Sequence, residues 1–104
     1  MKLATIDGAV ITTALGRMAR APRRMLGSAF WSFREELVLA WTTYEEPLDA
    51  HVIATLPTPL MVPGDVMAQL GMGIALQGPV DLAWDPDAAR LVVGPHRLPA
   101  TPSE

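Results

Sequence analysis

The stretch AFWSFREELVLAWTTY, residues 29–44, carries the strongest fold signal in the chain. Its odd-numbered positions are mostly apolar and its even-numbered positions are mixed, which is the period-two pattern of a half-buried strand. The apolar side is expected to face the core: Trp31, Phe33, Leu37, Leu39 and Trp41. Glu35 on that side indicates a bulge or the mouth of the core. A helix over residues 33–41 is the competing interpretation, but the flanking aromatic and threonine residues favour a strand.

The rest of the chain divides into short segments, because ten prolines and eight glycines interrupt it. A β-branched run predicts a strand over residues 4–13, interrupted by Gly8, and a basic connector follows over 17–28. The later segments are, in order, a strand over 51–56, a short helix over 66–70 capped by Asp65, a strand over 73–84, a proline turn over 85–88 and a last strand over 89–98.

This order of three strands, one helix and two strands is the element order of an OB-fold. We therefore expect an all-β protein, a small five-stranded OB-like Greek-key barrel with one short helix between strands 3 and 4. The barrel would occupy residues 1–99, and residues 100–104 would form a short disordered tail. An antiparallel barrel or sandwich with another chain path is the main alternative.

Charge is distributed unevenly along the chain. Residues 1–34 contain Lys2 and five arginines against Asp7, a net charge of +5. Residues 35–104 contain two arginines against ten acidic residues, a net charge of −8, so the whole chain carries −3. An anionic partner can therefore meet a positive face on a protein whose total charge is negative.

The composition excludes several classes of protein. Half of the 104 residues are hydrophobic and 18% are charged, which is typical of a globular domain and not of a disordered chain. The absence of cysteine excludes disulfides and cysteine-bound zinc. The N-terminal segment lacks the apolar run and cleavage site of a signal peptide, and the longest uncharged stretch, residues 66–80, is too short to span a bilayer. We expect a cytoplasmic protein with no membrane partner.

Two segments resemble the bacterial single-stranded DNA-binding proteins and the related primosomal replication protein N. The first is GRMARAPRRMLGSAFWSF, residues 16–33, in which Gly16, Arg20-Ala21-Pro22 and Gly27-Ser28-Ala29-Phe30 match the end of the first strand, a turn and a small-residue hairpin. The second is AQLGMGIALQGPVDL, which matches the fourth strand of that family at Leu70, Gly73, Gly78 and Val80. The resemblance implies an OB-fold that binds single-stranded DNA in replication, repair or recombination. It also implies a homo-oligomer, a dimer or tetramer, and the mean hydropathy of +0.25 agrees with a buried subunit interface.

Single strands are bound by a positive groove that follows the phosphates and by aromatic faces on which bases stack. The expected phosphate contacts are Arg17, Arg20, Arg23, Arg24 and Arg34. The expected stacking residues are Phe30, Tyr44 and Trp84. The alternatives are a solvated connector for the arginines, ordinary exposed aromatic residues for Phe30 and Tyr44, and a cap on the barrel for Trp84.

Catalysis has little support in the sequence. His51 and His96 are the only histidines, and neither has a companion at a metal-binding spacing. The phosphate-binding glycine loop, the nucleophile elbow and a paired-carboxylate pattern are all absent. We expect no enzymatic activity, no metal and no cofactor, and single-stranded DNA or RNA as the partner. The alternative function is a protein-interaction or assembly subunit, whose arginines would scatter instead of converging with aromatic residues on one groove.

Overall fold

The computed structural model describes residues 1–21, 27–41 and 44–103. These residues form ten strands and two helices. Their order is β1 (Lys2–Asp7), α1 (Gly8–Arg20), β2 (Ser28–Phe33), β3 (Leu37–Trp41), β4 (Tyr44–Leu48), β5 (Ala50–Val52), β6 (Leu60–Pro63), α2 (Gly64–Gly73), β7 (Pro79–Asp85), β8 (Arg90–Val93), β9 (His96–Pro99) and β10 (Thr101–Pro102). Neither helix in these ranges has the length and apolar character needed to cross a membrane.

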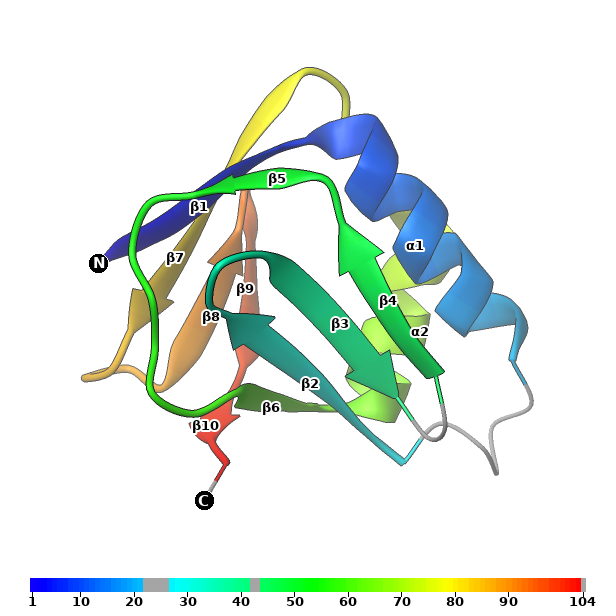
Figure 1. The fold of residues 1–104 in the computed structure, drawn as a ribbon. Helices are drawn as coiled ribbons and strands as arrows, with labels where there is room; N and C mark the ends of the chain where they lie inside the picture. Colours follow the sequence, from blue (N-terminus) through cyan, green and yellow to red (C-terminus); the bar gives the residue numbers. More distant parts are fainter. Residues whose placement is uncertain (22–26, 42–43, 104) are drawn as a thin grey trace.

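The strands form two five-stranded antiparallel sheets (Figure 1). Sheet A has the order β5-β1-β7-β8-β9, and sheet B has the order β10-β6-β2-β3-β4. At two corners a single residue carries the chain from one sheet to the other: Asp49 joins β4 to β5, and Ala100 joins β9 to β10. No strand pairing among the described residues connects the sheets at these corners. The expectation of a mostly β protein is confirmed, whereas a single five-stranded barrel with one helix is wrong.

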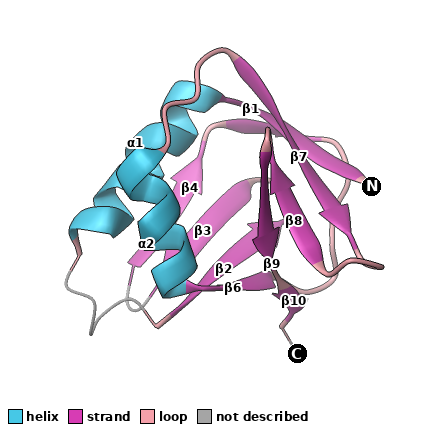
Figure 2. Ribbon diagram, turned by 180° about the vertical axis from the view of Figure 1, so that it is seen from behind, coloured by secondary structure: helices cyan, strands magenta, loops and turns pink. Residues whose placement is uncertain are grey.

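The inner faces of the two sheets and the two helices enclose one hydrophobic core. Figure 2 shows α1 and α2 side by side at one end of the molecule, with sheet B behind them. The helices approach each other closely at Gly71, where an added Cβ atom would overlap the carbonyl group of Leu15. Glycine is therefore required at this crossing because it has no side chain.

Residues 29–41 of the predicted strand form the β2–β3 hairpin near the centre of sheet B, and Tyr44 begins β4. The alternation is as predicted, because Trp31 pairs with Leu39 and Phe33 with Leu37, all four buried on the inner face. Residues 34–36 form the connecting turn. Glu35 lies in this exposed turn, which explains why a charged residue follows the apolar positions.

Helix α1 overturns the prediction of a strand over residues 4–13. The strand ends at Asp7, whose carboxylate accepts a hydrogen bond from the Ala9 N–H at 2.9 Å and caps the helix. The residues buried along α1 recur at helical spacing: Ile11, Ala14, Leu15 and Met18. Burial of this face outweighs the weak strand preference of the β-branched residues before it. The expected basic connector therefore begins inside the helix.

The later segments also differ in extent from the prediction. The strand expected over 51–56 is limited to β5, and the helix expected over 66–70 extends to Gly64 and Gly73, with Pro63 at its N-cap where Asp65 was predicted. The predicted turn is present one residue later, over residues 86–89, because Asp85 still belongs to β7, and the last strand is a hairpin of β8 and β9.

The expected disordered tail is wrong for residues 100–103. Ala100 is buried, Thr101 and Pro102 pair with β6, and the Ser103 N–H donates to the Pro59 carbonyl at 2.8 Å. Glu104 lies outside the described residues.

Candidate functional site

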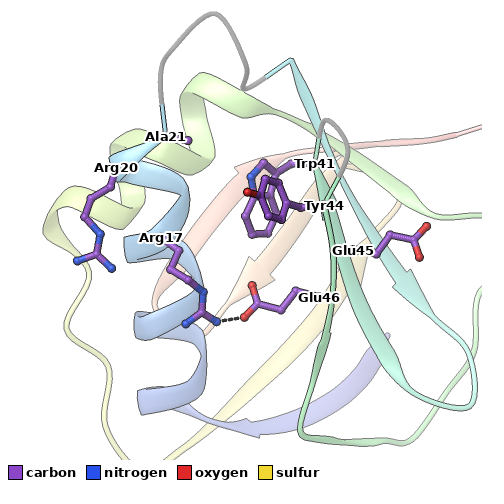
Figure 3. A pocket seen from close by; sticks show the side chains of 7 residues that line it. All are labelled: Arg17, Arg20, Ala21, Trp41, Tyr44, Glu45 and Glu46. Carbon is purple, nitrogen blue, oxygen red and sulfur yellow. Dashed lines mark ion pairs between the residues drawn. The ribbon is translucent and has the colours of Figure 1, made fainter.

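A cavity of about 580 Å³ lies between the C-terminal half of α1 and the β3–β4 hairpin (Figure 3). This volume is in the range usual for small-ligand pockets. Its lining combines two aromatic rings with charges of both signs: Arg17, Arg20, Ala21, Trp41, Tyr44, Glu45 and Glu46. We refer to it as the α1–β4 pocket.

Two stacked aromatic rings form one wall of the α1–β4 pocket. Trp41 and Tyr44 are cross-strand neighbours, and their ring centroids lie 5.7 Å apart with an interplanar angle of 22°. Trp41 is only 6% exposed and anchors the stack in the core, whereas Tyr44 is 60% exposed. A buried ring thus holds an exposed ring in a fixed orientation, which favours further stacking on the outer ring.

The last turn of α1 supplies the basic residues. Arg17 and Arg20 are three positions apart and so lie on neighbouring parts of the helix surface. The Arg17 guanidinium forms an ion pair with the Glu46 carboxylate on β4. Figure 3 shows Arg17 reaching across to Glu46, whereas Arg20 points away from the aromatic rings. Both cations lie near the helix C-terminus, where the helix dipole favours positive charge.

The two acidic residues of the pocket lie on opposite faces of β4. Glu46 pairs with Leu39, an inner-face residue, and its side chain is directed toward α1. Glu45 pairs with Ala40, and in Figure 3 its carboxylate points away from Arg17. Glu46 is therefore the acid that competes for Arg17.

The structure brings together three of the eight predicted binding residues: Arg17, Arg20 and Tyr44. Arg23 and Arg24 lie outside the described residues. Phe30 lies on the outer face of sheet B, and Arg34 lies at the β2–β3 turn, where its Nη2 donates to the Pro57 carbonyl at 2.7 Å. Neither is part of the α1–β4 pocket.

Trp84 lacks the exposed face that stacking would need. The Trp84 side chain is 7% exposed on the inner side of sheet A, and the Trp84 backbone is hydrogen-bonded to Met1. The Met1 terminal ammonium donates to the Trp84 carbonyl at 2.9 Å, and the Trp84 N–H donates to the Met1 carbonyl at 2.8 Å. Burial excludes Trp84 as a base-stacking residue in this structure.

Sequence reasoning missed Trp41 and Glu46 as parts of the site. The Trp-x-x-Tyr spacing of Trp41 and Tyr44 is the signal that could have identified the aromatic pair, because it is short enough for the two residues to face each other across antiparallel strands. No sequence signal indicated Glu46, since its contact with Arg17 depends on how α1 packs against sheet B.

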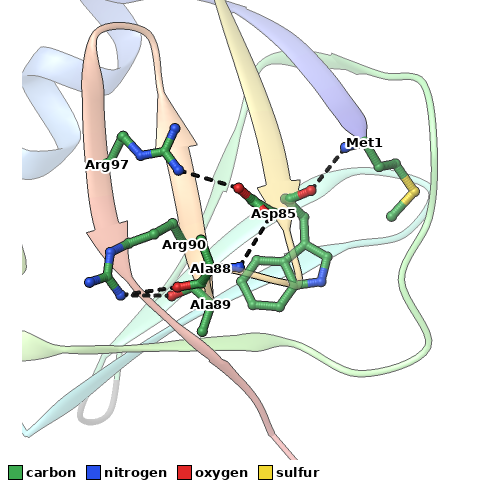
Figure 4. A network of polar contacts seen from close by, with 7 residues as sticks. Met1, Asp85, Ala88, Ala89, Arg90 and Arg97 are labelled. Carbon is green, nitrogen blue, oxygen red and sulfur yellow. Dashed lines mark hydrogen bonds and ion pairs between the residues drawn. The ribbon is translucent and has the colours of Figure 1, made fainter.

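The other polar clusters lie on the outer face of sheet A. Lys2 contacts Asp81 at 3.1 Å and lowers the pKa of that carboxyl, chiefly through its hydrogen bond. The Ala88 N–H and then Arg97, which lies 3.3 Å from Asp85, lower the pKa of Asp85 (Figure 4). Within the described ranges no three histidine or carboxylate side chains gather in a metal-binding arrangement.

No protein family, curated protein or solved structure matched this chain in the comparisons made with it. The resemblance to single-stranded DNA-binding proteins therefore stays a prediction from sequence motifs.

Proposed function

We propose that this chain is a non-catalytic binding module for single-stranded DNA and that the α1–β4 pocket is its contact site. The observation that carries the proposal is the exposed Tyr44 ring, stacked on buried Trp41 beside Arg17 and Arg20. Aromatic platforms with neighbouring cations are the usual means of holding single strands without reading their sequence. A role in replication, repair or recombination would follow from this activity.

Each group of the pocket has a distinct part in the proposed contact. A base stacks on the face of Tyr44 that Trp41 leaves open, and the flanking phosphates meet the guanidinium groups of Arg17 and Arg20. Because a guanidinium group has five N–H donors, Arg17 can bond a phosphate while it keeps Glu46. Glu46 nevertheless opposes phosphate binding through its charge, so the affinity reflects a balance within the pocket.

The direct test is fluorescence anisotropy with a labelled oligo-dT of about 30 nucleotides, a length that accommodates several domains at the ~4–16 nucleotides usual for one small binding domain. We expect binding that weakens steeply as salt rises, because phosphate contacts release counterions. Tyr44→Ala should weaken binding by ~1–3 kcal/mol, about 5- to 150-fold, the usual contribution of one stacked base. Tyr44→Phe is the matched control, since it keeps the ring.

Charge variants test the phosphate contacts. Arg17→Gln should lower the slope of log affinity against log salt by about 1. Arg97→Gln is its control, because Arg97 is also paired with an acid but lies on the outer face of sheet A. Glu46→Gln should strengthen binding, since it removes the competing carboxylate.

Absence of binding by the wild-type chain at low salt would contradict the proposal. The chain would then be interpreted as a protein-interaction or assembly subunit, the alternative that the scattered positions of Phe30 and Arg34 favour. Equal weakening by Arg17→Gln and Arg97→Gln would show a diffuse charge effect and no defined site.

A further inference from the structure

The outer face of sheet B is a nearly uncharged surface. Strand register places three residues side by side across it, Met61, Phe30 and Ala40, and a second row joins Ser32, Val38 and Pro47. Phe30, Val38, Ala40 and Met61 are each partly exposed and belong neither to the core nor to the residues packed against it. The first row continues from Ala40 to Glu45 on edge strand β4, and Glu45 is the charged residue at the end of that row.

None of the described elements covers this face. Figure 1 looks onto β2, β3 and β4 with no helix or strand in front of them, and Figure 2 shows that both helices lie on the other side of the sheet. An apolar patch of this kind on a folded domain is often functional.

The apolar rows end at a hollow that carries both signs of charge. It has a volume of about 610 Å³, lies beside the β2–β3 turn and is lined by Ser32, Arg34, Glu35, Glu36, Val38 and Thr55. The Arg34 Nη2 donates to the Pro57 carbonyl, which fixes the guanidinium at the rim, and the guanidinium has further N–H donors for other contacts. An apolar centre bordered by charged residues is the usual anatomy of a protein interface.

We propose that the outer face of sheet B binds a second copy of this chain in a symmetric, face-to-face dimer. In this arrangement a two-fold axis runs roughly parallel to the strands near β2, the central strand of the sheet. The axis brings the two β2–β3 turns to the same end of the interface, so that Arg34 of each copy meets Glu35 or Glu36 of the other. The same axis places β4 of one copy over β10 of the other, which separates the two Glu45 carboxylates.

The size of the face sets the expected strength of the dimer. Four strands of sheet B are four to six residues long, and edge strand β10 adds two residues. At ~4.8 Å between strands and ~3.3 Å per residue, these strands give a footprint of about 300–400 Å². A standard stable interface buries about 800 Å² on each partner. A face of this size is typical of weak or transient association, so we expect the dimer to form only at high protein concentration.

Sedimentation velocity of the full chain from about 5 to about 500 μM tests this proposal, because this range covers weak association. The wild-type chain should shift from monomer to dimer across this range. Phe30→Asp should weaken the dimer at least tenfold, since it buries a charge at the centre of the face. The control is Val92→Asp, which places the same charge at a partly exposed position on the outer face of sheet A, beside Arg97. This control should leave the dimer unchanged.

A charge exchange tests the orientation of the two copies. Arg34→Glu alone and the double variant Glu35→Arg/Glu36→Arg should each be monomeric, because like charges then meet at the turns. An equimolar mixture of the two variants should dimerise, since each copy then supplies the charge that the other lacks. Failure of the mixture to associate would overturn the proposed axis.

A wild-type chain that stays monomeric at the highest concentration would overturn the dimer, and the face would then be assigned to a different protein. Equal effects of Phe30→Asp and Val92→Asp would also overturn it. The proposal is independent of DNA binding, because Tyr44 belongs to the α1–β4 pocket. Tyr44→Ala should therefore leave the dimer intact.

Discussion

The two sheets of this protein have similar inner faces and very different outer faces. Both inner faces carry large apolar side chains, such as Trp31 and Phe33 in sheet B and Leu82 and Leu91 in sheet A. The outer face of sheet A carries the Lys2–Asp81 and Arg97–Asp85 ion pairs, whereas apolar rows cross the outer face of sheet B.

This difference separates the residues that specify the fold from those that are available for binding. Side chains directed into the core are constrained by packing in both sheets. Outward side chains are free of that constraint, so their chemistry reflects what each face meets. The outer face of sheet A carries paired charges, and the outer face of sheet B carries the apolar rows that we propose to bind a second copy.

The largest expected effect comes from comparing two phenylalanines of the same strand. Phe33→Ala should destabilise the protein by ~3–5 kcal/mol, because Phe33 is fully buried and its removal leaves a cavity. Phe30→Ala should cost ~1 kcal/mol or less, as expected of a surface position outside the core. Urea unfolding of both variants measures the difference. Equal losses would mean that the outer face of sheet B is part of the core, and the comparison between faces would fail.

A smaller effect is expected where the two helices cross. Gly71→Ala forces a methyl group against the Leu15 carbonyl and should cost ~1–3 kcal/mol, the usual range for overpacking. Because both sheets share one core with the helices, amide hydrogen exchange should accelerate in β1 and β2 alike. Gly73→Ala on the same helix is the control, since its Cβ would meet no atom within 4 Å. Faster exchange in one sheet alone would show that the sheets are separate cooperative units.

The smallest effect is a pH dependence confined to sheet A. The pKa values of Asp81 and Asp85 are lowered in the folded protein, so these carboxylates stabilise it above their ordinary pKa near 3.9. That contribution is lost as the pH falls through the ordinary value and then through the lowered one. The double variant Asp81→Asn/Asp85→Asn should be slightly less stable than the wild type at pH 7.

Urea unfolding between pH 7 and pH 2.5 measures this dependence in the wild type and the double variant. The variant should lose less stability than the wild type on acidification, because it lacks the two titrating groups. Parallel losses in the two proteins would show that neither ion pair contributes. Lys2→Gln and Arg97→Gln separate the two sites, since each removes one cation.

The sequence was most informative where local pattern and tertiary environment agree. Alternation in residues 29–41 predicted which side chains are buried, because one face of the sheet packs on the core. The helix over 8–20 was missed, since Val10, Ile11, Thr12 and Thr13 favour a strand locally. The hydroxyl groups of both threonines are hydrogen-bonded in the folded helix. Thr13 donates to the Ala9 carbonyl in the same helix at 2.9 Å, and Thr12 donates to the Leu76 carbonyl outside it at 3.3 Å.

The candidate site was predictable only in part. Arg17, Arg20 and Tyr44 were chosen for their chemistry, and the structure places them around one pocket. Their neighbours could not be predicted, because the pocket forms where α1 packs against a strand more than twenty residues later in the chain. Trp84, by contrast, is buried on the inner face of β7, beside the first strand, and it does not line this pocket.

The position of β1 between β5 and β7 has a consequence for biosynthesis. The first strand pairs Thr5 with His51 on one side and with Asp81 on the other, so sheet A cannot be completed until β7 has left the ribosome. The β2–β3 hairpin needs only its own residues and can form much earlier. Strand pairing between distant segments also slows folding. The nascent chain can therefore hold a formed β2–β3 hairpin before β1 meets β7, its later partner in sheet A.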